Sequence, residues 1–558
     1  MNARLKFLFI VLALCVVALL AQAPPGARIS NFEAPTSDTA GKHSVVKGAN
    51  AEPVGKGVYK ITAPHVDNFG ARGVLESTID AKECFFDPSG SQDVWSDTEF
   101  AMKRVDGQMF LKGVGFRWTS RTSQLAVSNK VEALIQRRAV ASASTAGGSS
   151  NAVHITAQSL RYDADLVTFT GDVRAIDPNG ELRARVLKVR LSEKNDLLEI
   201  EAIDEVLLTQ EDTEARGGRA VYNHVSGLLR LSQNAQWKMG DRFGESDLLI
   251  LDRTNKTVRA ENNVKMSLPS SLVTTNLPGE AARASTNRLN ISADTFDYAE
   301  TNLTTGGRIV IFNGNVHALD PQAELTCELL TLFFDPTNRL VRAVADRDVQ
   351  IARGDGWIKG TRAVFEKDEI TIPNNPTWRL KDNTGAAELL VFNPRTREVR
   401  AIKKVRMEIP ISGATNLLLS ATGTTNTAPP TSSMLIVTAD YFTNLNYVAT
   451  FADNVRASEA RGQIDANKIE VHLNSTNRVE RVVAEGDVII IEEKTRAIGQ
   501  RADYDVTAGL IRLSGNPKVI GEDATAIAKE FVIDLINHKR QPVAPFRIEV
   551  RNIKQKKP

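Results

Sequence analysis

The side chains best suited to catalysis or metal binding are scattered along this chain of 558 residues. No two of the seven histidines stand two to four residues apart, and they occupy positions 43, 65, 154, 224, 317, 472 and 538. The three cysteines, Cys15, Cys84 and Cys327, form neither a CxxC motif nor a zinc-ligand pattern. GxSxG, HExxH, Walker and GxGxxG sequences are absent. We therefore expect no catalytic residue, no metal site and no cofactor, so the chain is not expected to be an enzyme.

The charge of the chain is nearly balanced. It has 69 Lys and Arg residues against 67 Asp and Glu residues. Without a strong excess of either sign, no long-range field can gather a highly charged partner, and we expect no nucleic acid to bind. The length allows roughly three to five domains of ordinary size.

The feature that repeats is a short apolar β-pattern. It occurs as VTFTGDV (Val167–Val173), IVIFNGNV (Ile309–Val316) and VATFADNV (Val448–Val455), in copies roughly 140 residues apart. Each copy brings an upstream island: AQSLRY (Ala157–Tyr162), ADTFDY (Ala293–Tyr298) and ADYFTN (Ala439–Asn444). Each also brings a downstream island: RAVY (Arg219–Tyr222), RAVF (Arg362–Phe365) and RADY (Arg501–Tyr504). Co-repetition of three islands predicts one structural unit copied three times.

Apolar and polar residues alternate through these copies. In the first copy Val167, Phe169 and Val173 fall on one face, and Thr168 and Asp172 fall on the other. This period of two is typical of antiparallel strands with one face against an interior. A shorter repeat of about 30 residues, marked by an Asn-Val or Asp-Val step, predicts a serial stack of short strands.

The inward residues allow two interpretations. One is a closed, dry core between two sheets, packed like any sandwich. The other is an open trough that holds acyl chains. The alternation is the same in both cases, so the pattern alone leaves both open. Cys327 stands where the other copies have Ala184 and Ala466, which indicates a small core residue.

The N-terminus carries an export or anchoring signal. Arg4 and Lys6 precede Phe7–Ala21, a run without a charged residue. Pro24 and Pro25 follow directly after an A-x-A site, and proline there should obstruct a peptidase. We therefore favour an uncleaved membrane anchor, with the bulk of the chain outside the cytoplasm. A cleaved signal peptide and a soluble periplasmic chain are the alternative.

The copies and the composition divide the chain into five parts. Breaks in composition lie at Ala139–Asn151, Pro269–Arg288 and Ser412–Ser433, and they are either flexible linkers or long loops. The expected parts are an anchor with a short linker at 1–28, a diverged β-unit with its linker at 29–150, and three copies at 151–288, 289–433 and 434–558.

Several of these motifs resemble a known family. Val153–Ala157 (VHITA), VTFTGDV and RAVY, followed by Leu229–Ser232 (LRLS), resemble the OstA-like domain of periplasmic lipopolysaccharide transport proteins. The anchor and the unit that ends with Leu125–Asn129 (LAVSN) resemble LptC, the family's membrane-anchored component. The three later copies resemble LptA, its soluble bridge component. Asp453 departs from the pattern, because it replaces the glycine of the other copies.

The resemblance implies a fold, a passenger and partners. The fold would be all-β, with tandem open β-jellyroll units stacked end to end behind one N-terminal transmembrane helix. The partners would be lipopolysaccharide, the permease and ATPase of an inner-membrane ABC transporter, and the outer-membrane translocon or further bridge units joined by β-augmentation. The acyl chains would lie in a trough lined by Val153, Ile155, Phe169, Val173, Leu289, Ile291, Phe312, Val316, Leu435, Val437, Phe451 and Val455.

Two other classes of function compete with lipid transport. A membrane-tethered periplasmic β-scaffold could bind partner proteins at its edges without a lipid passenger. A carbohydrate-active enzyme on a β-solenoid would need a cluster of acidic or basic residues on one face of the repeat, and the sequence shows none.

Overall fold

The structure is a computed structural model. It describes residues 27–550 except for 38–42, 71–72, 137–151, 164, 179, 193–195, 253, 270–287, 301–306, 322, 338, 397, 412–432, 460–461, 475–478, 493 and 535–538. No helix in the described residues could span a membrane. The predicted anchor and the greater part of each compositional break lie outside the described residues, so these expectations stay predictions.

Every regular element in the described residues is a β-strand, which confirms the all-β fold. The first strands are β1 (Ile29–Ser37), β2 (His43–Gly55), β3 (Val58–Thr62), β4 (His65–Phe69), β5 (Leu75–Ala81), β6 (Glu83–Phe86), β7 (Asp93–Arg104), β8 (Met109–Thr119) and β9 (Gln124–Gln136). The next are β10 (Ala152–Ala157), β11 (Ser159–Asp163), β12 (Leu166–Asp177), β13 (Gly180–Leu191), β14 (Leu197–Gln210), β15 (Thr213–Asn223), β16 (Leu228–Met239), β17 (Arg242–Asp252) and β18 (Thr257–Pro269).

The remaining strands continue the series to the end of the described chain. They begin with β19 (Arg288–Glu300), β20 (Arg308–Leu319), β21 (Glu324–Phe334), β22 (Leu340–Arg353), β23 (Gly356–Glu366), β24 (Glu369–Pro373), β25 (Thr377–Leu380), β26 (Asn383–Ala386), β27 (Leu389–Asn393) and β28 (Glu398–Ile411). They end with β29 (Ser433–Leu445), β30 (Val448–Glu459), β31 (Gly462–Leu473), β32 (Val479–Glu492), β33 (Thr495–Asp505), β34 (Leu510–Ser514), β35 (Lys518–Ile520), β36 (Ala524–Asp534) and β37 (Lys539–Val550).

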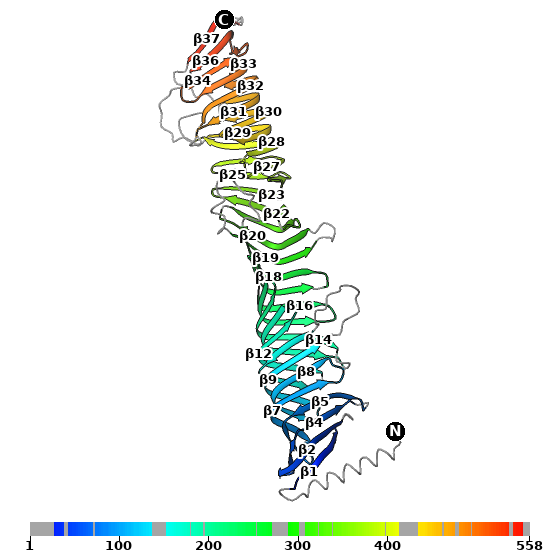
Figure 1. The fold of residues 1–558 in the computed structure, drawn as a ribbon. Coiled ribbons are helices and arrows are strands. Elements are labelled where there is room, and N and C mark those ends of the chain that lie inside the picture. The colour runs from blue at the N-terminus through cyan, green and yellow to red at the C-terminus, as the bar shows by residue number, and fades with distance from the viewer. Residues whose placement is uncertain are drawn as a thin grey trace, which may run out of the picture. The chain divides into compact units, whose positions relative to one another are not determined.

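The contacts divide the chain into two compact units, Met1–Met266 (unit 1) and Ser267–Pro558 (unit 2). Within each unit the strands follow one another in chain order (Figure 1). Pairing between strands close in sequence is antiparallel, as in β12 with β13 and β30 with β31. Antiparallel neighbours need only short turns, which agrees with the turn residues between the apolar runs.

Most long strands bend at one point near the middle, where a β-bulge shifts the register. In β12 the shift lies between Thr170 and Val173, and the residues there have left-handed backbones, with φ of 82° at Gly171 and 45° at Asp172. Two residues in this conformation turn the strand sharply. The two halves then present their apolar sides to one interior, since Phe169 and Val173 are both buried. The predicted Asn-Val and Asp-Val steps mark these bends.

The same bend occurs in the third copy despite its missing glycine. Asp453 and Asn454 have φ of 63° and 54°, and the register of β30 shifts between Ala452 and Val455. Asp and Asn tolerate the left-handed region better than other side chains do. Asp453 therefore belongs to a regular bend.

Candidate functional site

One line of side chains crosses the strands next to the bends, on one side of them, and we call it the deep row. In unit 1 its cross-strand neighbours are Leu160, Phe169, Leu187, Ala202, Ala220, Leu231 and Leu249. All of them are buried, and Phe169 is 0% exposed. The row therefore forms the closed floor of the interior.

The deep row of unit 2 repeats the same order of side-chain sizes. Its first part is Phe296, Phe312, Leu330, Ala345 and Ala363. A later part is Phe442, Phe451, Ile469, Ala484, Ala502, Leu513 and Phe531. In both parts two paired large residues, a third large residue and two alanines follow one another, as in unit 1. The phenylalanine pairs pack closely, with ring centroids 5.3 Å apart for Phe296 and Phe312 and 4.9 Å apart for Phe442 and Phe451.

A second inward line lies beyond the bend, and we call it the rim row. In unit 1 it contains Ile155, Ala175, Leu182, Leu208, Ala215, Trp237 and Gly244. In unit 2 it contains Ile291, Ala318, Leu325, Ile351, Ile358, Trp378, Gly385, Met407, Val437, Ala457, Ile464, Ile490, Ala497, Val519, Ala526 and Ile548.

The rim row is covered in part. Members such as Ile155, Ile291 and Val437 are buried, whereas others are not. Leu182 and Leu208 in unit 1 are half-buried, and so are Leu325, Ile351 and Ile464 in unit 2. The bent strands also have inward residues on the side of the bend that carries the deep row. Some of them, such as Ile200 and Phe365, are half-buried, whereas the deep row itself is buried. A dry core that closed on itself would bury all of these apolar residues. The burial pattern therefore describes an apolar groove with a buried floor and partly exposed walls.

The twelve residues predicted to line a trough all lie on strands of this interior. Ten are buried, and they are Ile155, Phe169, Val173, Ile291, Phe312, Val316, Leu435, Val437, Phe451 and Val455. Val153 and Leu289 are half-buried near strand ends. The phenylalanines belong to the floor, so the accessible apolar surface lies instead on rim residues such as Leu182 and Ile464. Their alternation with outward polar residues was visible in the sequence, but their exposure was not.

The outward faces of the described strands carry many ion pairs. Glu181, for example, is 2.5 Å from Arg174 and from Arg183, and hydrogen bonds from these guanidinium groups lower the pKa of its carboxyl to about 2. Cys327 is buried opposite Val316, where the other copies place Ala184 and Ala466, as predicted. Burial raises the pKa of its thiol to about 11, which keeps the thiol protonated and unreactive.

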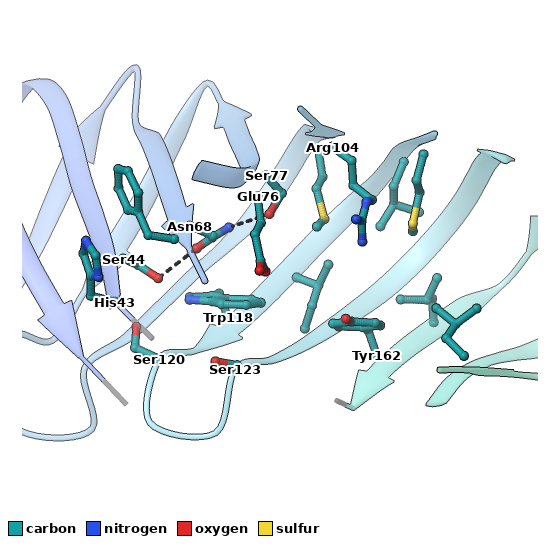
Figure 2. Close-up of a pocket in the computed structure, with 17 residues that line it drawn as sticks. His43, Ser44, Asn68, Glu76, Ser77, Arg104, Trp118, Ser120, Ser123 and Tyr162 are labelled. Atoms are coloured by element: carbon teal, nitrogen blue, oxygen red, sulfur yellow. Dashed lines mark hydrogen bonds between the residues drawn. The ribbon is translucent and has the colours of Figure 1, made fainter. Parts of the chain in front are cut away.

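Unit 1 contains a different kind of site, a cavity of about 70 Å³ with one polar end and one apolar end (Figure 2). It lies between the first nine strands and β11 and β13. At the polar end Ser44 Oγ donates to Asn68 Oδ1 at 2.8 Å, and Asn68 Nδ2 donates to Ser77 Oγ at 3.2 Å. Trp118 and Ser120 line the same end. The apolar end is lined by Met102, Leu111, Leu125 and Leu160, among others.

Sequence reasoning missed this cavity. Its polar residues come from β2, β4, β5 and β8 and from the turn after β8, so no local motif brings them together. One signal was present, because Ser120 continues the inward alternation of Phe116 and Trp118, where an apolar residue is expected.

The fold and the groove define a class of protein: an all-β chain of bent antiparallel strands around a partly open apolar interior. Residues 154–257 and 437–539 match the family model described as LptA/(LptD N-terminal domain) LPS transport protein. Each matched segment contains most of one copy of the deep and rim rows. These two segments are therefore similar to LPS transport domains, and the all-β fold agrees with that similarity.

Comparisons with curated proteins and with solved structures give no further support for this similarity. No curated protein matches the chain. Among solved structures, the chain is similar to LptH, the LptA homologous periplasmic component of the conserved lipopolysaccharide transport device from Pseudomonas aeruginosa. The two chains are 19% identical with a TM-score of 0.19, and the match covers 21% of this chain and 95% of that chain.

Proposed function

We propose that this chain carries lipopolysaccharide across the periplasm, from an inner-membrane ABC transporter towards the outer membrane, with acyl chains held in the apolar groove. The half-buried members of the rim rows, such as Leu182, Leu325 and Ile464, are the observation that carries this proposal. They place apolar side chains where a lipid tail can reach them, over a floor that stays closed. The two segments similar to LPS transport domains support the same passenger.

The groove can bind a lipid tail without a polar site. Removing one methylene group from water contributes roughly 0.8 kcal/mol, so a tail covered along part of its length already binds well. Binding of this kind has no directional requirement, and a tail can move from one rim residue to the next. The chain then performs no reaction of its own, and the energy for transport comes from the ATPase of the transporter.

The partners would join at the ends of the strand series. In the described residues β37 pairs with β36 alone, and Val543, Phe546, Ile548 and Val550 on it are exposed. An edge strand with unpaired backbone groups and exposed apolar side chains is suited to β-augmentation. We propose that it receives a strand of the outer-membrane translocon or of a further bridge unit.

The membrane end of the path rests on the sequence. We propose that an uncleaved anchor near the N-terminus holds the chain at the inner membrane, next to the permease and ATPase. An LptC-like unit at 29–150 would follow, and then three LptA-like units at 151–288, 289–433 and 434–558. One polypeptide would thus combine the anchored component and the bridge.

Crosslinking in cells tests the passenger. A photo-crosslinking residue at Leu182, Leu325 or Ile464 stands on the rim row, and its outward neighbour Arg183, Thr326 or Asp465 provides the matched control. We expect lipopolysaccharide adducts at the three inward positions and none at the three outward ones. Equal capture on both faces would contradict a lipid path inside the groove. No capture on either face, in a folded and exported chain, would favour the membrane-tethered scaffold instead.

A further inference from the structure

Buried polar residues are concentrated in the first strands. Nine polar or charged residues are buried in the described part of the chain, and eight of them lie between Thr36 and Ser120. The grooves that follow are floored by apolar side chains, so the polarity is a local feature of β1 to β9. Most of these residues are hydrogen-bonded, as Ser44, Asn68 and Ser96 are. A buried polar group without a partner destabilises the fold, so any such group among them is exceptional.

Two polar atoms of the cavity have no hydrogen-bond partner. They are Nε1 of Trp118 and Oγ of Ser120, whose residues are only 6% and 3% exposed. Figure 2 shows the nitrogen end of the indole ring on the side that faces Ser44 and Ser120. Leaving such a group unsatisfied costs about 1–3 kcal/mol. The cavity therefore offers two hydrogen-bond donors that an incoming group can satisfy.

The charges around the cavity argue against an ionised ligand. Arg104 is committed to Asp106, with Nη2 2.9 Å from Oδ2. Glu76, also in the lining, brings a negative charge of its own. Burial raises the pKa of Tyr162, which also lines the cavity, so its hydroxyl stays neutral. Arg104 is the one Lys or Arg among the lining residues, and the ring of His43 stacks on Phe69 with centroids 4.6 Å apart.

We propose that this cavity binds the uncharged carbonyl of an acyl ester or amide, with the attached chain against Met102, Leu111, Leu125 and Leu160. A carbonyl oxygen has two lone pairs and can accept from the Trp118 N–H and the Ser120 hydroxyl together. The proposal rests on the proposed lipid passenger. It places the recognition of the lipid's polar linkage at this cavity in unit 1.

The test compares two ligands that differ in the carbonyl alone. 1-Monodecanoylglycerol has an ester, and 1-O-decylglycerol has an ether in its place. Isothermal titration of the full chain gives the ratio of the two affinities. We expect the ester to bind more tightly, and Trp118→Phe and Ser120→Ala each to reduce the ratio by about 3- to 10-fold, the loss of one hydrogen bond. Trp357→Phe, at a half-buried tryptophan outside the cavity, should leave the ratio unchanged.

The outcomes separate this proposal from the proposed function. If both ligands bind and the ratio is the same in all variants, the cavity holds ordered water only and the inference is wrong, while lipid binding stands. If neither ligand binds and the rim crosslinks also fail, the lipid passenger itself is wrong. A thermal unfolding midpoint for Trp118→Phe within a few degrees of the parent shows that the variant is folded.

Discussion

The indole ring of Trp378 covers Gly385 on the neighbouring strand, and its Cε2, Cζ2 and Nε1 atoms fill the space where a side chain at 385 would stand. Trp237 covers Gly244 in the same way in unit 1. Both pairs lie on the rim row, and Val519 stands opposite Ala526 at the matching place in the third copy. In both places the tryptophan ring forms part of the groove wall, and the glycine opposite leaves the space that the ring fills.

This relationship predicts that Gly385→Ala destabilises unit 2. The new methyl group would overlap the ring of Trp378, which must then leave its position or push the strands apart. Overpacking of this kind typically costs about 1–3 kcal/mol. The free energy of unfolding in urea measures it.

Gly521→Ala is the matched control for this substitution. A methyl group there meets only the carbonyl oxygen of Ala524, at an ordinary distance of 3.7 Å. We expect a change of less than about 0.5 kcal/mol, as for other substitutions that meet no close neighbour outside the core. An equal loss of stability in the two variants would show that the ring does not restrict position 385.

The bends predict opposite effects of two substitutions at equivalent places. Any side chain at position 171 would strain the backbone, because φ there is 82°. A methyl group at this position would also meet the side chain of Gln158. We expect Gly171→Ala to cost about 1–2 kcal/mol. Asp453 already carries the left-handed strain at φ of 63°, so Asp453→Gly should stabilise the third copy by about 0.5 kcal/mol. Urea unfolding of both variants measures whether each free energy of unfolding rises or falls. A loss of stability in Asp453→Gly would show that the backbone at position 453 is not strained.

Local patterns predicted the strands and their inward faces, because alternation is a property of neighbouring residues. Phe169, Phe312 and Phe451 are buried on the interior side, as their periodicity indicates. Asp453 departs from the glycine pattern in residue type only, and the sequence does not show that two left-handed residues suffice for the bend. The phenylalanines are part of the floor, not the walls, because pairing across strands decides depth and that pairing is not local.

Alternation between neighbouring residues could not predict the cavity in unit 1. Asn68 and Trp118 are polar or amphipathic residues in a run without a recognisable motif, and their meeting depends on the order in which β2, β4 and β8 pack. The hydrogen bonds from Ser44 to Asn68 and on to Ser77 join residues that lie far apart in the chain. Only the three-dimensional structure shows that these groups share one space.

The last prediction concerns pH and His65. Its Nδ1 atom is 2.6 Å from Oδ1 of Asp80, and its Nε2 atom is 3.0 Å from Oδ1 of Asp67. The hydrogen bond to Asp80 is the largest cause that raises the pKa of His65 above its ordinary value of 6.5, and the charge of Asp67 adds to it. Lys47 also pairs with Asp67, at 2.8 Å, and keeps that carboxylate in place.

The raised pKa determines the sign of the effect. Below pH 6.5 the histidine is protonated in both the folded and the unfolded chain, and the stabilisation by the two carboxylates is fully present. As the pH rises from 6.5 through the folded pKa, only the folded chain keeps the proton, so the free energy of unfolding falls. We expect His65→Gln to remove this part of the pH dependence of unit 1 stability above pH 6.5. His154→Gln, at an exposed histidine of β10, should retain it. Urea unfolding across this pH range measures the difference, and parallel curves for the parent and His65→Gln would show that the ion pairs with His65 contribute nothing to folding.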